Sequence, residues 1–419
     1  MREMKDSGIE WIGKIPQEWE VSHIKYHLKW KSIKGFPNEE ILSLYRDYGV
    51  IPKNSRDDNY NVTSLDASGY KLVDVGDFVI NKMKAWQGSM GVSNYRGIIS
   101  PAYHICEFTN KLIFKRYFHY LMRNISYLPE YKRLSTGMRV GQWDLQFDDF
   151  KNIPFLIPPF TEQQKISTYL DHKCREIDSV ISKTKATIEE YKKLKQSVIT
   201  QAVTKGIIPN RPMKDSGIEW IGEIPQEWEI NSMFQLFVQV KNKNRLLSET
   251  NLLSLSYGKI KRKDINTTDG LLPQSFDTYN IVQENDIVLR LTDLQNDHKS
   301  LRVGIANEQG IITSAYITIR NTSDNLAKYL YYYLHSFDIS KGFYGMGSGV
   351  RQGLVWDDLK LFKFVIPSKN EQQEIANYLD EKCTEIDKLI AKKEQLLTEM
   401  ENYKKAVIYE YVTGKKEVE

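Results

Sequence analysis

The sequence has few cysteines and no long apolar run. Its three cysteines, Cys106, Cys174 and Cys383, never form a closely spaced pair, which excludes a disulfide framework and a zinc site of the usual spacing. No stretch approaches the roughly 18 consecutive apolar residues of a membrane-spanning helix, and the N-terminal residues lack the apolar core of a signal peptide. We therefore expect a cytoplasmic protein with no membrane partner.

A strong net charge is also missing. The 419 residues include 58 Lys and Arg against 54 Asp and Glu, which gives a formal net charge of +4. Any affinity for nucleic acid must then come from the local arrangement of charges and not from overall basicity. The length, for its part, allows two domains, each with its own core.

An internal duplication organises the chain. Residues 4–20 recur as residues 213–229 with one substitution, at an offset of 209 residues (213 − 4). The distal ends of the two halves match at the same offset: Glu162-Gln163-Gln164 and Tyr169-Leu170-Asp171 recur as Glu371-Gln372-Gln373 and Tyr378-Leu379-Asp380. Between these ends the halves differ. This pattern indicates a protein whose ends hold two copies of one partner and whose middles bind two different targets.

The dissimilar middles, 21–158 and 230–367, have the composition of mixed α/β domains. Short apolar runs bounded by Gly, Asn and Asp predict strands, at 78–80 and 98–99 in the first middle and at 287–289 and 317–319 in the second. One aromatic stretch in each middle, at 117–122 and 329–334, predicts an amphipathic helix. We expect these aromatic side chains to pack on a sheet and not to stack on bases.

Two segments, 161–205 and 370–413, contain no Gly or Pro and predict long helices. Apolar residues in both follow the alternating spacing of four and three that is typical of a coiled coil. The apolar seam residues are Leu170, Ile177, Ile181, Ile188, Tyr191 and Val198 in the first helix and Leu379, Ile386, Ile390, Leu397, Met400 and Val407 in the second. Polar seam members, among them Lys195 and Lys404, could fix the register.

The charges of the two helices also favour pairing. The first helix has nine basic and six acidic residues (9 − 6 = +3), and the second has six basic and ten acidic residues (6 − 10 = −4). An antiparallel pair would turn the duplication into a pseudo-two-fold axis. We expect an α+β protein in which two mixed α/β domains are joined by two long antiparallel helices that form a coiled coil with this symmetry.

These features resemble the specificity subunit of type I restriction–modification enzymes. The resemblance rests on the segment that ends in Ile-Pro-Gln-Glu-Trp-Glu, on residues 75–86, 100–103 and 157–164, and on Ala202-Val-Thr-Lys-Gly206, and it spans the chain twice. It implies two target recognition domains, 1–160 and 206–369, that each read one half of an asymmetric, interrupted site in double-stranded DNA. The helices, 161–205 and 370–419 with the C-terminal tail, would set the unread gap.

The resemblance also implies partners. The helices would dock two modification (methyltransferase) subunits, and restriction (translocase and nuclease) subunits would join this core. The chain itself would perform no catalysis and bind no cofactor or metal, since S-adenosylmethionine, ATP and Mg²⁺ would belong to the partner subunits.

Residues that read DNA need fixed donor patterns, such as Arg or Lys toward guanine and Gln toward adenine, while other cations hold phosphates. In the first domain the candidates are Tyr45, Arg46, Lys82, Lys84, Trp86, Arg139, Gln142 and Trp143. In the second they are Lys259, Lys261, Arg262 and Lys263 in one predicted loop, Arg290, Arg351 and Gln352. Both domains contain Gly-x-Arg with a nearby Gln, at 137–142 and 349–352, and we favour this turn. For the isolated lysines, a solvated surface position is the favoured interpretation.

Two other classes of function remain open at this point. Ile157-Pro-Pro-Phe160 resembles an adenine methyltransferase motif but lacks its Asn or Asp, and no phosphate-binding loop is present. A stand-alone nuclease or methyltransferase would be active as a purified single chain. A coiled-coil scaffold would show no sequence-dependent affinity for duplex DNA.

Overall fold

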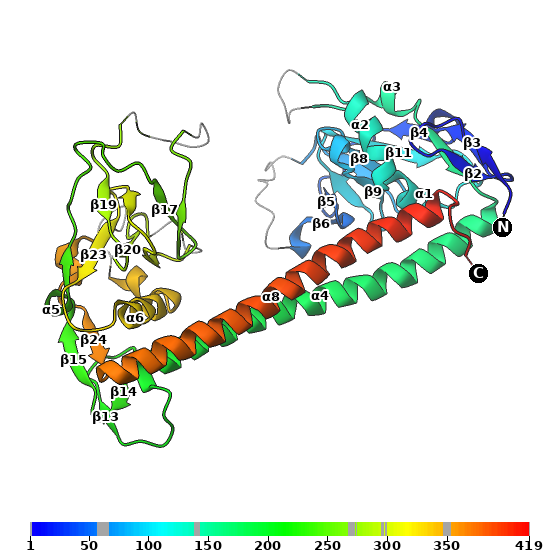
Figure 1. Cartoon of the computed structure of the whole chain (residues 1–419). Coiled ribbons are helices and arrows are strands. Elements are labelled where there is room, and N and C mark those ends of the chain that lie inside the picture. The colour runs from blue at the N-terminus through cyan, green and yellow to red at the C-terminus, as the bar shows by residue number, and fades with distance from the viewer. Residues whose placement is uncertain are drawn as a thin grey trace. The chain divides into compact units, whose positions relative to one another are not determined.

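The computed structural model of the chain describes residues 2–56, 67–137, 143–266, 273, 275–294, 297, 300–346 and 353–418. It divides into two compact units (Figure 1): unit 1 is formed by Met1–Lys185 and Gln395–Glu419, and unit 2 by Ala186–Glu394. Each long helix therefore contributes one segment to each unit. In the described ranges no helix is both long and apolar enough to cross a bilayer.

Unit 1 is a mixed α/β domain with parts of the two long helices. Its strands are β1 (Met4–Asp6), β2 (Lys14–Pro16), β3 (Glu20–His23), β4 (Leu28–Lys31), β5 (Leu42–Tyr45), β6 (Gly49–Pro52), β7 (Lys71–Val73), β8 (Phe78–Asn81), β9 (Met90–Val92), β10 (Gly97–Ile99), β11 (Tyr103–Phe108) and β12 (Pro154–Ile157). Its helices are α1 (Lys115–Met122), α2 (Leu128–Leu134), α3 (Phe147–Phe150) and parts of α4 (Phe160–Lys205) and α8 (Lys369–Val412). The central antiparallel sheet has the order β4-β11-β8-β9.

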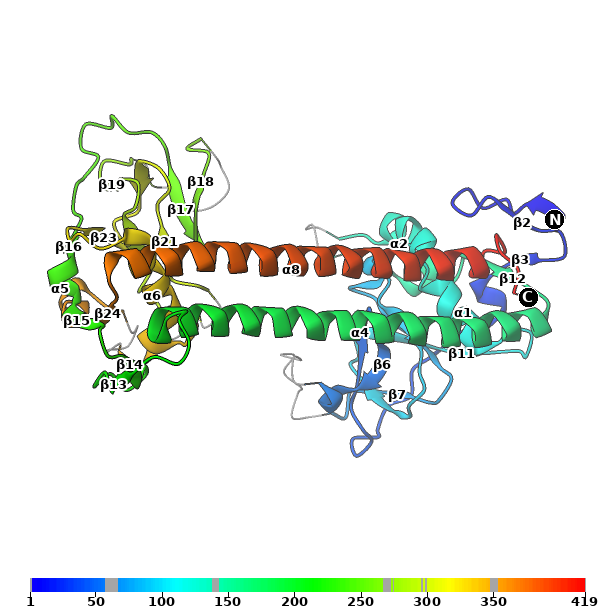
Figure 2. The same cartoon turned by 60° about the horizontal axis from the view of Figure 1, so that its bottom comes forward.

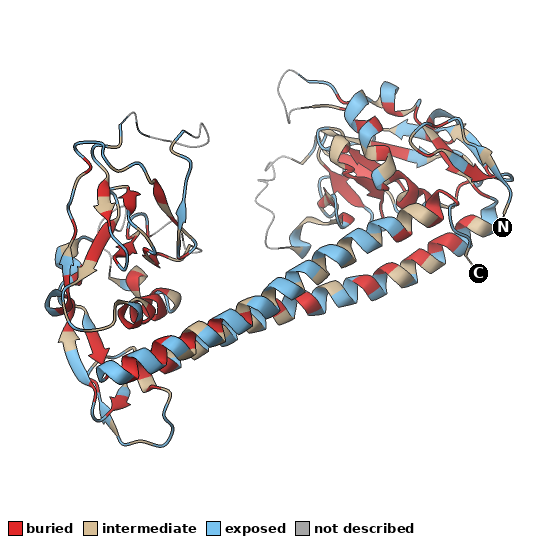
Figure 3. Ribbon diagram, in the orientation of Figure 1, coloured by how far each residue is buried: buried red, intermediate tan, exposed pale blue. Residues whose placement is uncertain are grey.

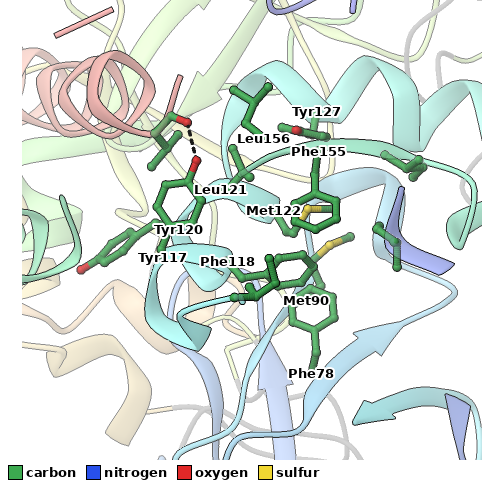
Figure 4. Packing of buried hydrophobic residues seen from close by; sticks show 14 of the residues in the cluster. Phe78, Met90, Tyr117, Phe118, Tyr120, Leu121, Met122, Tyr127, Phe155 and Leu156 are labelled. Carbon is green, nitrogen blue, oxygen red and sulfur yellow. Dashed lines mark hydrogen bonds between the residues drawn. The ribbon is translucent and has the colours of Figure 1, made fainter. Parts of the chain in front are cut away.

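The core of unit 1 lies between this sheet and α1 (Figure 4). Phe118, Leu121 and Met122 of α1 are fully buried against Phe78 of β8 and Met90 of β9. The predicted strands at 78–80 and 98–99 and the predicted helix at 117–122 are confirmed, and so is the packing role of the aromatic residues of α1.

Unit 2 repeats this architecture with a dissimilar sequence. Its strands are β13 (Met213–Asp215), β14 (Glu223–Pro225), β15 (Glu229–Ser232), β16 (Phe237–Gln239), β17 (Leu253–Ser256), β18 (Lys259–Arg262), β19 (Asn280–Val282), β20 (Ile287–Leu289), β21 (Val303–Ile305), β22 (Gly310–Ile312), β23 (Ile317–Asn321) and β24 (Lys363–Ile366), and its helices are α5 (Met233–Leu236), α6 (Ala327–Ile339) and α7 (Trp356–Leu359). The central sheet has the order β16-β23-β20-β21, which is the topology of the first sheet. The predicted strands at 287–289 and 317–319 and the predicted helix at 329–334 are confirmed.

The turns before β8 and before β20 show how different residues build the same structure. Gly76 and Asn285 both have positive φ angles, +90° and +69°, which glycine and asparagine adopt more readily than other residues. The next residue is aspartate in both units. Asp77 accepts a hydrogen bond from the main-chain N of Asp74, and Asp286 accepts one from that of Gln283, each at 2.8 Å.

Within each unit, α4 and α8 run antiparallel and side by side (Figure 2). In unit 1 Lys404 Nζ lies 2.7 Å from both carboxylate oxygens of Asp178, and in unit 2 Lys195 Nζ lies 2.7 Å from both of Asp387. All twelve predicted apolar seam residues are buried or half-buried. Buried and intermediate positions recur along both helices (Figure 3). The antiparallel coiled coil is therefore confirmed, and its seam lysines do make register-specific ion pairs.

Candidate nucleic-acid interface

One acidic residue fixes each duplicated N-terminal segment to the first turn of a long helix. In unit 1 Glu162 accepts a 3.0 Å hydrogen bond from Trp19 Nε1 and forms a 2.6 Å ion pair with Arg2. The hydrogen bond that Arg2 donates to Glu162 raises the pKa of Arg2, so this cation stays charged. Unit 2 repeats the arrangement: Glu371 accepts a 3.0 Å hydrogen bond from Trp228 Nε1 and forms a 2.6 Å ion pair with Arg211.

The glutamine that follows is buried in both units and satisfies main-chain groups. Gln163 accepts a hydrogen bond from Phe114 N at 2.7 Å and donates to the carbonyl oxygens of Leu112 and Pro158. Gln372 likewise accepts from Leu326 N at 2.8 Å and donates to Pro367 O. Because buried polar groups need partners, these side chains fix the loop before α1 and before α6 on the long helix.

A third repeated contact holds the aromatic helix of each domain. Tyr120 OH donates a 2.6 Å hydrogen bond to Asp171, which is also paired with Arg116. Tyr332 OH donates a 2.7 Å hydrogen bond to Asp380, which is also paired with Lys328. The repeated Glu-Gln-Gln and Tyr-Leu-Asp sequences therefore encode one set of anchors, and these anchors leave the loops of each domain free to differ.

The hairpin of β5 and β6 carries two of the predicted DNA-binding residues, Tyr45 at the end of β5 and Arg46 in the turn. Tyr45 is half-buried, whereas the Arg46 side chain is 63% exposed and lies 3.1 Å from Asp47. Sequence reasoning missed Tyr48 in the same turn, which is 58% exposed and has the Arg56 guanidinium 4.3 Å from its ring centroid. An exposed aromatic residue beside cations in a short hairpin was the signal that could have identified it.

A second group in unit 1 brings Lys82, Trp86 and Trp143 together. The two indole rings are 5.3 Å apart in an edge-to-face arrangement, and Lys82 Nζ pairs with Asp144 at 2.8 Å. Lys84 is exposed beside them. The remaining candidates of this domain, Arg139 and Gln142, lie outside the described residues. Arg and Lys at such a surface can bind phosphates, and paired indoles offer a rigid apolar contact for a groove edge.

The prediction that the basic residues 259–263 of unit 2 lie in a loop is wrong. Lys259, Lys261 and Arg262 lie on strand β18 and not in a loop, because β18 pairs with β17 in an antiparallel hairpin. Lys259 and Lys261 alternate along the strand and so share one exposed face, whereas Arg262 forms an ion pair with Glu308. Lys263 follows the strand and is exposed.

The other unit 2 candidates are Arg290, Arg351 and Gln352. Arg290 follows β20, its side chain is 33% exposed, and its guanidinium lies 3.7 Å from the Asp297 carboxylate. Arg351 and Gln352 lie outside the described residues. The favoured Gly-x-Arg turns at 137–142 and 349–352 therefore stay a prediction.

Comparisons with known proteins place these features in a family. The model of the type I restriction modification DNA specificity domain matches the chain twice, at residues 16–190 and 225–399. The type I restriction enzyme MjaVIII specificity subunit of Methanocaldococcus jannaschii is 25% identical over 435 residues, which cover 96% of this chain and 94% of that protein.

Solved structures share the fold. A chain from a study of complex assembly and conformational transition of the type I R-M system has a TM-score of 0.68 at 13% identity, over 96% of this chain and 99% of that chain. The HsdS subunit from Thermoanaerobacter tengcongensis has a TM-score of 0.50 at 13% identity, over 96% of this chain and 98% of that one. The chain thus belongs to the family of type I restriction–modification DNA specificity domains, of which it carries two copies.

Proposed function

We propose that this chain is the DNA sequence-recognition subunit of a type I restriction–modification complex. Its first domain, 1–160, and its second domain, 206–369, each read one half of an interrupted, asymmetric site in double-stranded DNA. Helices 161–205 and 370–419 set the unread gap and dock two modification subunits, and restriction subunits join them. Catalysis, with its S-adenosylmethionine, ATP and Mg²⁺, belongs to these partners, and the complex acts on DNA in the cytoplasm.

The observation that carries this proposal is the contrast between identical anchors and different loops. Glu162 and Glu371 make the same contacts with Trp and Arg at the same distances. The surfaces that could meet DNA carry different cations: Arg46 on a hairpin turn in unit 1, and Lys259 and Lys261 along a hairpin strand in unit 2. Two domains that bound the same sequence would have no reason to carry different cations there.

The helix pair offers a matching surface for the partners. Four exposed apolar residues, each directly before a seam residue, repeat at the offset of 209 (389 − 180 and 403 − 194): Val180 (42% exposed), Leu194 (49%), Leu389 (42%) and Tyr403 (45%). In an antiparallel pair, equal heptad positions face the same side. Unit 1 therefore presents Val180 with Tyr403, and unit 2 presents Leu389 with Leu194.

These two apolar pairs fit an apolar face of a partner helix, since exposed apolar stripes on helices mark interaction sites. Because the pairs are related by the duplication, they support two copies of one partner and not two different ones. We assign them to the modification subunits, which must be present in equal number on the two half-sites to methylate both strands.

The test is to co-express the chain with its cognate modification subunit and to map adenine methylation across a genome. We expect one two-part motif. Replacing residues 21–158 with the corresponding segment of a relative should change one half of the motif, and replacing residues 230–367 should change the other. An unchanged motif after both exchanges would contradict the division of labour, and methylation by the purified chain alone would favour a stand-alone enzyme.

A further inference from the structure

Unit 2 contains a fully buried arginine whose guanidinium binds main-chain carbonyls of one loop. Arg302 is 0% exposed and donates hydrogen bonds to the carbonyl oxygens of Arg290 at 3.1 Å and Thr292 at 2.9 Å. It also donates to those of Asp293 and Asp297. Its guanidinium therefore binds four main-chain carbonyls that follow β20, including that of Asp293, which has a positive φ of +57°.

Neighbouring groups fix Arg302 itself. Asp338 of α6 accepts hydrogen bonds from the main-chain N of Arg302 and of Val303, the latter at 3.2 Å. Tyr344 OH accepts from Arg302 Nε at 3.1 Å and donates to Asp297 O at 2.8 Å. A guanidinium is planar and has five donors, so it can satisfy several carbonyls at once. Loss of these donors would leave buried carbonyl acceptors unpaired. The main chain that carries Arg290 is therefore fixed from within the core.

Unit 1 also has a buried arginine that binds main-chain carbonyls, but at a different place in the fold. Arg123, which follows α1, donates to Met90 O at 2.9 Å and to Arg46 O. Burial lowers the pKa of this guanidinium to about 10, so it is charged at neutral pH. Gly49 at the end of the hairpin turn has a φ of +75°, and a Cβ there would lie 3.3 Å from Arg123 Nη1. The hairpin turn 45–49 therefore packs directly against the Arg123 guanidinium.

The two arginines are not copies of one another. By the matching of structural elements, Arg123 corresponds to His335, since Tyr120 matches Tyr332. Arg302 corresponds to Ser89, since Gly91 of β9 matches Gly304 of β21. Each nevertheless donates to the carbonyl of another arginine, Arg46 or Arg290. In both cases the recipient has a side chain that reaches solvent and an acidic neighbour, Asp47 at 3.1 Å or Asp297 at 3.7 Å.

We propose that Arg123 and Arg302 are positioning residues of DNA recognition, each of which presents one base-reading arginine, Arg46 in unit 1 and Arg290 in unit 2. The inference rests on the proposed function. A loop whose main chain is already fixed loses less conformational freedom when it meets a base edge, so the arginine it carries discriminates more sharply between bases. The acidic neighbours hold each reading side chain at the surface until DNA replaces them.

The experiment uses the full chain co-expressed with its modification subunit, and adenine methylation is read as relative use of each base at each motif position. Arg302→Met keeps the volume of the side chain and removes its donors. We expect about tenfold weaker discrimination at one or more positions of the half read by unit 2, with the other half unchanged. Arg123→Met should weaken discrimination in the half read by unit 1 and leave the other half unchanged. Each variant is therefore the matched control of the other.

A double variant separates positioning from a general loss of structure. If Arg302 acts through Arg290, then Arg302→Met added to Arg290→Ala should relax the motif no further than Arg290→Ala alone. Lysine variants offer a milder change, because one ammonium with three donors cannot reach all of these carbonyls. Arg302→Lys should give discrimination between that of the wild type and that of Arg302→Met. If Arg302→Met does not accumulate in cells, Arg302→Lys alone tests the positioning role.

Two results would overturn the proposal. One is an unaltered base preference in the half concerned, and the other is an equal fall in methylation at all sites with no change in preference. A wild-type complex that yields no two-part motif would instead contradict the proposed function itself.

Discussion

Trp19 Nε1 donates a 3.0 Å hydrogen bond to Glu162 Oε2, and this bond ties the N-terminal segment to the first turn of α4. The indole N–H can only donate, and the other carboxylate oxygen is held by Arg2, so the geometry of the junction is fully specified. Trp228 and Glu371 reproduce it in unit 2. The attachment of each domain to its helix is thus independent of what its loops bind.

Glu371→Gln should lower the free energy of unfolding of unit 2 by about 1–3 kcal/mol, because the buried Arg211 would keep its charge with only the exposed Glu227 carboxylate left to pair with it. The glutamine oxygen could still accept from Trp228. Both members of this ion pair are 9% exposed, compared with 18% and 19% for Arg2 and Glu162. Glu162→Gln should therefore have the smaller effect.

Chemical denaturation of the full chain measures this difference. The matched control is Glu227→Gln, since Glu227 pairs with the same arginine but is 57% exposed. An exposed pair should contribute less than about 1 kcal/mol. Equal effects of Glu371→Gln and Glu227→Gln would show that the buried junction is not special.

Asp338→Asn should stabilise unit 2 at neutral pH. Burial raises the pKa of Asp338 to about 6, above its unfolded value, so the stability associated with this group is fully present below the unfolded pKa and is lost as pH rises through 6. Asparagine keeps an acceptor for the main-chain N of Arg302 and Val303 and carries no charge. The gain should be about 1–3 kcal/mol above pH 7 and should shrink as pH falls from 6 toward 4.

The measurement is the difference in unfolding free energy between wild type and variant across this pH range. His335, on the same helix, titrates in the opposite sense, because burial lowers its pKa to about 4. Taking the difference between the two chains cancels this contribution. A gain that is independent of pH would mean that the charge of Asp338 is not the cause.

The coiled coil and the sheet strands could be predicted because their signals are local and repeat. A seam such as Leu170 to Val198 needs only its spacing to be recognised. Strand β18 could not, since Lys259 and Lys261 are typical of loops and their pairing with β17 depends on tertiary context. The roles of Arg123 and Arg302 were equally hidden. Each is a lone arginine without a motif, and Arg123 contacts a carbonyl 77 residues away in the chain.

Lys259→Gln and Lys261→Gln should weaken DNA binding by the assembled complex without changing its base preference. Both side chains lie on one exposed face of β18, and we propose that they hold phosphates. Each lost contact should reduce the slope of log affinity against log salt concentration by about 1. Lys388→Gln, at an exposed position on α8, is the control and should leave the slope unchanged. A change in the methylated motif would instead mark the strand as a base reader.

Each apolar pair on the helices that is removed should cost the complex one bound modification subunit. Val180→Ser with Tyr403→Ser alters only the pair of unit 1, and Leu194→Ser with Leu389→Ser alters only that of unit 2. Since all four side chains are 42–49% exposed, each substitution should change the free energy of unfolding by less than about 1 kcal/mol. Partner helices that pack on these residues would nevertheless lose their apolar contact.

Native mass spectrometry of the co-expressed complex should therefore find one modification subunit with either double variant and none with the quadruple variant. Glu189→Ser is the control, because Glu189 is exposed on α4 directly after a seam residue and so faces away from these pairs. It should retain two subunits. If the quadruple variant still binds two subunits, the partners dock elsewhere, and the repeated apolar positions are ordinary surface. If either double variant loses both subunits, the two sites are coupled, and the equivalence that the duplication imposes on them extends to cooperative assembly.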